Sequence, residues 1–276
     1  MSGIRKRPIH TTLSTEAYNI LERYEHELGN KSTVLEKALI SMDKTRFKSR
    51  LTLKDVQTVI KRSKSGIKGF DDLIEGGIPD GFVVIITGPP GGGKSTFSMQ
   101  FLLDGADKKE RCVYFSFEED ADQIAKQFAR FGWDIQKYVE EGWIEIYGLS
   151  MLTTEEMIDI LGTYKPKRAV FDPINVFYEA ENLRRAASWR NLFKLLKRDK
   201  ITSMVITEKQ HGIEVKKFDD YDFMGDGIVF LDKAIVGNTV THNLSVLKMR
   251  GTSVDSTPKE FTFAERGIEL TGWTVS

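Results

Sequence analysis

From residue 65 onward, short apolar runs alternate with longer amphipathic stretches. The apolar runs have the length of β-strands and fall at Val83–Thr87, Cys112–Phe117, Ala169–Phe171, Ser203–Thr207 and Ile228–Leu231. This alternation predicts an α/β fold in which a mostly parallel sheet is covered by helices. Two later runs, Asn243–Lys248 and Lys259–Phe263, predict antiparallel strands added near the C-terminus.

The N-terminal end of the chain shows a different pattern. Residues Pro8–Leu13 alternate between apolar and polar positions, which predicts a β-strand. Ser14 is a good N-cap for the next segment, a helix with apolar residues along one side that ends at Gly29. A second helix is expected to begin at Ser32 or Thr33. These elements form a small β-α-α unit.

The chain of 276 residues is therefore expected to hold a small domain at 1–43, a basic connector at 44–64 and a large domain at 65–276. Residues 1–64 carry fourteen Lys and Arg but seven Asp and Glu, whereas the whole chain carries forty of each. A basic N-terminal part beside an acidic body indicates different partners for the two. An exposed, solvated basic surface explains the charge equally well.

Hydropathy and cysteine content indicate the cellular setting. The longest apolar run, Phe82–Ile86, is far shorter than the roughly 20 residues of a membrane-spanning helix, and no signal peptide is visible. The single cysteine, Cys112, excludes an internal disulfide and fits a reducing compartment. We therefore expect a cytoplasmic protein without a membrane partner.

A complete phosphate-binding motif, G-x-x-x-x-G-K-[ST], follows the first strong strand and precedes an amphipathic stretch. Its glycines let successive backbone N–H groups point at phosphate oxygens, and the following helix N-terminus adds partial positive charge. Lys94 is expected to reach the β- and γ-phosphates, and Ser95 to bind Mg²⁺. The predicted nucleotide-binding residues are Gly88, Pro89, Pro90, Gly91, Gly92, Gly93, Lys94, Ser95 and Thr96.

Acidic residues follow two other predicted strands. Asp172 ends the strand at 169–171, where a carboxylate would hold Mg²⁺ directly or through water. Glu118 and Glu119 follow the strand at 112–117, and either is a candidate general base that orients water toward the γ-phosphate. A solvated acidic helix start is the alternative for this pair.

Taken together, the motifs resemble the KaiC-like branch of RecA-type ATPases over about residues 65–272. The matching segments are Ser65–Gly81 before the phosphate loop, the loop itself, the pair Glu118-Glu119, Asp172, the sensor-like Thr207-Glu208 and Lys248–Thr252, which contains K-x-R-G. The stretch Tyr221–Met224 lacks the Ser/Thr pair that the clock protein phosphorylates, so autokinase activity is not expected.

The resemblance implies an ATPase domain that works in a ring, with a hexamer favoured and ATP bound between neighbouring subunits. Lys248 and Arg250 would then reach the γ-phosphate of the adjacent subunit's ATP, where cations stabilise charge on the transferring phosphoryl group. The alternative for these two residues is a pair of surface cations on an edge strand, which protects against aggregation.

The N-terminal unit resembles a ribbon-helix-helix domain, which folds as a two-fold dimer whose paired strands enter the DNA major groove. This resemblance implies dimer contacts through residues 1–43 and possible binding of double-stranded DNA. The DNA-contacting residues would be Lys6, Arg7, His10 and Thr12, with Lys31 and Ser32 holding phosphate at a helix N-terminus. A packing module that never touches DNA is the alternative.

The favoured function is a Mg²⁺-dependent, KaiC/RecA-type ATPase that forms a homo-oligomer and associates with DNA through its N-terminal domain. The alternative is a nucleotide-gated DNA-binding regulator with negligible ATP turnover. A third reading, recombination on single-stranded DNA, would need a basic or aromatic loop. The segment His211–Asp222 offers both kinds of residue but also four acidic ones, so this reading is disfavoured.

Overall fold

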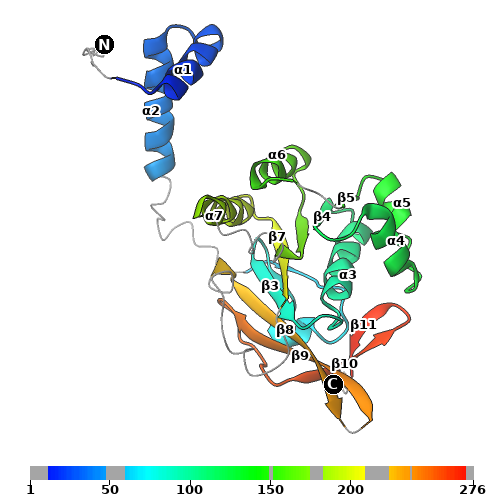
Figure 1. Cartoon of the computed structure of the whole chain (residues 1–276). Coiled ribbons are helices and arrows are strands. Elements are labelled where there is room, and N and C mark those ends of the chain that lie inside the picture. Colours follow the sequence, from blue (N-terminus) through cyan, green and yellow to red (C-terminus); the bar gives the residue numbers. More distant parts are fainter. Residues whose placement is uncertain are drawn as a thin grey trace. The chain divides into compact units, whose positions relative to one another are not determined.

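The computed structural model describes residues 12–47, 60–148, 152–174, 183–208, 224–236 and 238–271. The chain divides into two compact units, residues 1–59 and 60–276, which are described separately (Figure 1). No helix in these described ranges is both long enough and apolar enough to cross a membrane.

The N-terminal unit contains two helices, α1 (Thr15–Leu28) and α2 (Lys31–Phe47). The side chain of Ser14 accepts the backbone N–H of Ala17 at 3.2 Å, which confirms the predicted N-cap. The start of α2 differs from the prediction, because Asn30 Oδ1 accepts the N–H of Thr33 at 3.0 Å and the helix begins at Lys31.

The predicted strand at 8–13 lies mostly outside the described residues. Its last two residues, Thr12 and Leu13, are not in a strand.

A nine-stranded sheet forms the centre of the C-terminal unit, in the order β11-β10-β9-β8-β3-β7-β6-β4-β5. The six strands from β8 to β5 are parallel, and β9, β10 and β11 are added antiparallel. The sequence predicts the antiparallel strands β9 and β10. The bounds are β3 Val83–Gly88, β4 Cys112–Ser116, β5 Ile144–Tyr147, β6 Arg168–Asp172, β7 Thr202–Glu208, β8 Gly227–Val236, β9 Thr239–Met249, β10 Lys259–Ala264 and β11 Gly267–Leu270.

Helices cover both faces of this sheet (Figure 1). Alternate residues of each strand point to opposite faces, so Val84 and Ile86 of β3 pack with α3, α4 and α5, whereas Val83 and Ile85 pack with α6 and α7. The helices are α3 Lys94–Asp107, α4 Ala121–Ala129, α5 Ile135–Glu140, α6 Thr154–Tyr164 and α7 Leu183–Arg198. The α/β class with a mostly parallel sheet is therefore confirmed.

Four short strands were missed by the sequence pattern. The strands β5 and β11 are four residues each and lie at the two edges of the sheet. The other two, β1 (Arg62–Ser63) and β2 (Ile78–Pro79), pair antiparallel in a separate two-stranded sheet. Strands this short carry too few alternations to be distinguished from loops.

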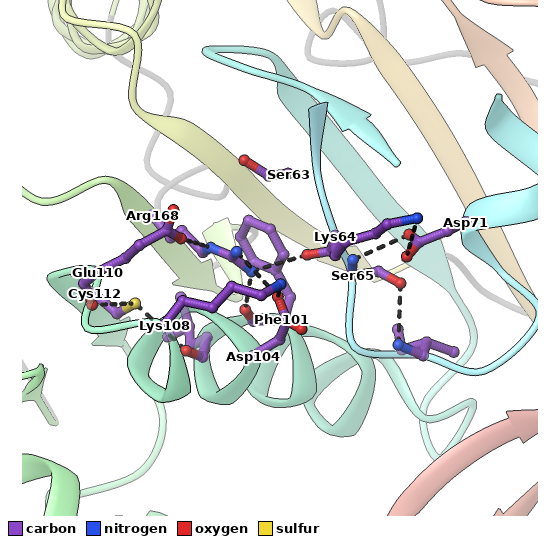
Figure 2. Close-up of polar contacts among 12 residues, drawn as sticks. Ser63, Lys64, Ser65, Asp71, Phe101, Asp104, Lys108, Glu110, Cys112 and Arg168 are labelled. Atoms are coloured by element: carbon purple, nitrogen blue, oxygen red, sulfur yellow. Dashed lines mark hydrogen bonds and ion pairs between the residues drawn. The ribbon is translucent and has the colours of Figure 1, made fainter. Parts of the chain in front are cut away.

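A buried arginine connects α3 to β6. Arg168, the first residue of β6, is only 1% exposed and pairs with Glu110 at 2.6 Å and with Asp104 of α3 at 3.0 Å (Figure 2). Its guanidinium also donates to the carbonyl oxygens of Phe101 at 2.7 Å and Lys64 at 2.9 Å. The charge of Arg168 is balanced by carboxylates and its N–H groups have hydrogen-bond acceptors, as a buried cation requires.

Neighbouring residues adapt to this arginine. A Cβ atom on Gly105 of α3 would lie 2.6 Å from Arg168 Nε, so only glycine fits at this crossing. Burial raises the pKa of the Cys112 thiol to about 12, which keeps it neutral beside the charged cluster.

We expect the substitution Arg168→Met to lower the free energy of unfolding of the C-terminal unit by about 3–5 kcal/mol, because two carboxylates and two carbonyls each lose their bond to the buried guanidinium. Urea titration monitored by tryptophan fluorescence measures this loss. The control is Arg198→Ala, which removes an exposed ion pair with Asp199 and should cost less than about 1 kcal/mol. Equal effects of the two substitutions would contradict the assigned role of Arg168.

Candidate functional site

The phosphate-binding motif forms a tight loop between β3 and α3. Gly88 ends β3 with a φ of 144°, and a Cβ atom there would collide with the carbonyl oxygen of Leu231. Gly93 has a φ of 93°, and its Cβ would lie 3.0 Å from the ring of Phe263. Only glycine adopts these conformations in this space, so the loop backbone approaches β8 and β10 closely.

Lys94 lies at the centre of the loop. Its side chain is 5% exposed, and Nζ donates to the carbonyl oxygens of Gly88 at 3.1 Å and Pro89 at 2.9 Å. Nζ also forms an ion pair of 3.3 Å with Glu208, which ends β7 beside β3. The lysine is therefore held by the loop that it is expected to complete around a phosphate.

Ser95 and Asp172 come together although they are far apart in the sequence. Asp172 ends β6, and its carboxylate accepts hydrogen bonds from the hydroxyls of Ser95 and Tyr114. Burial raises the pKa of Asp172, whereas these two hydrogen bonds and Lys94 lower it. Burial outweighs these opposing causes, so the pKa of Asp172 is raised overall. A bound cation would favour the carboxylate form.

The donor set fits Mg²⁺. A hydroxyl and a carboxylate are hard oxygen ligands, and Mg²⁺ in phosphate-transferring sites is held by one or two carboxylates together with the substrate's phosphates. Within the described part of the chain, no group of three or more His, Cys, Asp and Glu could hold a metal ion. A magnesium ion at this site would be held by the hydroxyl of Ser95, the carboxylate of Asp172 and a bound phosphate.

The two glutamates after β4 face the same space. Burial is the first cause that raises the pKa of Glu118, and the carboxylates of Glu208 and Asp172 raise it further, while Lys94 lowers it. Burial also raises the pKa of Glu119, with contributions from Asp172 and Asp120. The backbone N–H of Glu119 donates to Ser116 Oγ at 3.0 Å, which fixes the turn that presents both side chains.

These groups line one cavity of about 550 Å³. Its walls include Lys94, Ser95, Asp172 and both glutamates, so the structure brings together the predicted phosphate, metal and base residues. A further part of the lining, here called the aromatic wall, was missed by sequence analysis: it consists of Gln127, Phe128, Arg130, Phe131, Lys233, Val240, His242 and Phe263. These side chains come from α4 and the segment after it and from β8, β9 and β10, so no local motif could have identified them.

The aromatic wall combines aromatic rings with cations. The guanidinium carbon of Arg130 lies 4.4 Å from the ring centroid of Phe131 and 5.6 Å from that of Phe263. His242 packs edge-on against Phe263 with ring centroids 5.1 Å apart. Burial and the charge of Lys233 lower the pKa of His242, which favours its neutral form.

Lys248 and Arg250 lie near the start of β3, at the opposite end of this strand from the phosphate loop. Met249 pairs with Gly227, and Gly227 lies beside Val84 near the start of β3, whereas the phosphate loop follows its end. The separation along β3 is roughly 13 Å. The structure therefore does not bring the two cations to the phosphate loop of their own chain.

Of the residues predicted to contact DNA, Lys6, Arg7 and His10 lie outside the described residues, as does the segment 211–222. Thr12 and Ser32 are exposed. Lys31 Nζ contacts the hydroxyl of Tyr18 at 2.7 Å and the carboxylates of Glu22 at 3.4 Å and Glu25 at 3.8 Å. Its side chain is thus directed at α1.

Comparison with known proteins places this geometry in context. The model of the KaiC ATPase family matches residues 63–274, and a second model, described as the N-terminal domain of a family, matches residues 13–46. A UPF0273 protein of Pyrococcus furiosus is 32% identical over 235 residues, which cover 76% of this chain and 94% of that protein.

Circadian clock oscillator protein KaiC of Synechococcus elongatus is 31% identical over 234 residues. The match covers 76% of this chain but 44% of the clock protein, so the chain spans less than half the length of that relative. The crystal structure of the KaiC-like protein PH0186 of Pyrococcus horikoshii superposes with a TM-score of 0.68 at 30% identity, over 77% of this chain and 99% of that one.

Proposed function

The chain belongs to the KaiC family of RecA-type ATPases, and on this basis we propose that it hydrolyses ATP with Mg²⁺ in a ring of identical subunits. The observation that carries the proposal is the single cavity in which Lys94, the Ser95–Asp172 pair and two glutamates face one another. A site that only sensed nucleotide would need the phosphate and metal groups but not a water-activating carboxylate.

The reaction is in-line attack of water on the γ-phosphorus. The bond from phosphorus to the β–γ bridging oxygen breaks, which yields ADP and phosphate, and a proton of the attacking water passes to a glutamate. Glu118 is the proposed acceptor, because its carboxylate lies in the field of Lys94, the residue that binds the transferred phosphate. Bound Mg²⁺ would neutralise phosphate charge, and Ser95 and Asp172 would hold it.

The adenosine part of ATP would extend toward the aromatic wall of the cavity. The stacked Arg130 and Phe131 and the ring of Phe263 offer flat surfaces of the kind on which a nucleobase packs. Neutral His242 adds a hydrogen-bonding group to the same wall.

Lys248 and Arg250 support the ring arrangement by their position. Because they lie at the end of the strands opposite the phosphate loop, they can contact a bound nucleotide only in the pocket of a neighbouring copy. Head-to-tail contact of this kind closes into a ring when the rotation permits. The two cations then complete the electrostatic stabilisation of the phosphoryl group and make turnover depend on assembly.

The N-terminal unit is proposed to pair with a second copy. Among its described side chains only Leu21 and Val34 are buried apolar residues, whereas Tyr18, Ile20, Tyr24 and Leu39 are exposed. A dimer would cover such a surface. Double-stranded DNA is the proposed further partner, supported by the net positive charge of residues 1–64.

We expect wild-type protein to hydrolyse ATP and Glu118→Gln to lower kcat by about 10²- to 10⁴-fold, since the amide cannot accept the proton. ATP binding should be retained, because the phosphate loop is unchanged. Phosphate release and binding of a fluorescent ATP analogue measure the two properties, with Glu119→Gln as the matched variant. Turnover equal to wild type in both variants, or none in the wild-type protein, would favour the nucleotide-gated regulator instead.

The pH dependence of kcat/KM identifies the base. The raised pKa of Glu118 means that protonation, and hence loss of activity, begins at a higher pH than for an ordinary glutamate. Glu208→Gln removes a charge that raises this pKa, so the acid limb should shift to lower pH. Asp120→Asn removes a charge that acts on Glu119 and should leave the limb in place. A shift with Asp120→Asn alone would assign the base to Glu119.

A further inference from the structure

The two cations of the K-x-R-G segment are attached to one short stretch of the same chain. Lys248 Nζ donates to the carbonyl oxygen of Gly225 at 2.8 Å, and Arg250 Nη1 forms an ion pair of 3.1 Å with Asp226 Oδ1. The backbone N–H of Arg250 also donates to the carbonyl oxygen of Asp226 at 2.9 Å. Both side chains therefore start from positions set by residues 225 and 226, immediately before β8.

Asp226 is itself held from three directions. Its carboxylate is buried and accepts the Nζ of Lys197 on α7 at 2.9 Å and the backbone N–H of Val83 at 3.1 Å, besides Arg250. Its own backbone N–H donates to the carbonyl oxygen of Val83 at 2.7 Å. The carboxylate that holds Arg250 is thus fixed to the first residue of β3, the strand that leads into the phosphate loop.

The charges of this cluster leave Arg250 available to an anion. One carboxylate faces two cations, so the group of Asp226, Lys197 and Arg250 keeps a net positive charge. The side chain of Arg250 is 54% exposed, and a guanidinium has five N–H donors, of which the pair with Asp226 uses one nitrogen. Asp226 can therefore orient Arg250 without neutralising it.

We propose that Asp226 is the positioning residue for Arg250, one of the two cations that this chain lends to its neighbour's ATP. The proposal rests on the trans arrangement proposed above and assigns a residue that does not touch nucleotide. Without the carboxylate, Arg250 is a long, exposed side chain with many rotamers, and a displacement of about 1 Å at a transition state costs on the order of 10²-fold in rate.

Asp226→Asn is the variant that tests this role. The amide removes the negative charge and presents hydrogens to Lys197 and Arg250, so kcat should fall about 10- to 10²-fold while KM for ATP changes little, because the variant's own pocket is intact. The matched control is Asp199→Asn, which breaks the exposed ion pair with Arg198 at the end of α7 and should leave turnover unchanged.

Mixing two inactive proteins separates positioning from a structural defect. An Asp226→Asn chain keeps a competent pocket but lends a misplaced cation, and a Glu118→Gln chain lends a correct cation but has no base. Where they meet, the first pocket receives the second chain's Arg250, so an equal mixture should regain about a quarter of wild-type turnover. If Asp226 only supported its own pocket through Val83, mixing would restore nothing and the proposal would be overturned.

The same assay with Arg250→Ala distinguishes the trans arrangement of the cations from the positioning role of Asp226. Restoration by Arg250→Ala with Glu118→Gln, but not by Asp226→Asn with Glu118→Gln, rejects the role of Asp226 and leaves the trans arrangement standing. Failure of both mixtures with an active wild type rejects the trans arrangement and the role of Asp226 with it. Thermal melting shows whether each variant is folded. If Asp226→Asn does not fold, Asp226→Glu takes its place, and mixing it with Glu118→Gln should restore ATP turnover to the same extent.

Discussion

The relative placement of Ser95 and Asp172 depends on the buried guanidinium of Arg168, which joins the other ends of α3 and β6. Arg168 ties the first residue of β6 to the second half of α3 through Asp104 and the carbonyl of Phe101. The other ends of these elements hold Asp172 and Ser95, the two residues that would share a metal ion. Because a strand and a helix are stiff, fastening them at Arg168 sets how the hydroxyl and the carboxylate meet.

The parallel sheet imposes the second constraint, because the carboxyl ends of all its parallel strands lie on the same side. The phosphate loop, Glu118, Asp172 and Glu208 follow the ends of four neighbouring parallel strands and therefore gather in one cavity. The antiparallel β9 runs the other way, so Lys248 near its end and Arg250 just after it lie at the opposite end of the parallel strands. One topology thus places a carboxylate-rich pocket at one end of the parallel strands and two cations at the other end. In the proposed ring these cations would serve the next pocket.

Local signals were sufficient to predict five of the six parallel strands, the phosphate loop and the position of Asp172 at a strand end, because each depends on a few consecutive residues. They were insufficient for the aromatic wall around Phe131 and Phe263, which is assembled from segments more than a hundred residues apart. Arg168 and Asp226 also escaped notice, since a buried charge looks like a surface charge until its partners are known. The short edge strands β5 and β11 carry too little pattern to predict.

The dependence of ATP turnover per chain on protein concentration, measured together with mass by light scattering in Mg-ATP, tests the central claim most directly. If each pocket needs its neighbour's cations, turnover per chain falls on dilution in parallel with dissociation of the oligomer and approaches zero for the monomer. Turnover that stays constant down to concentrations at which the protein is monomeric would contradict the account.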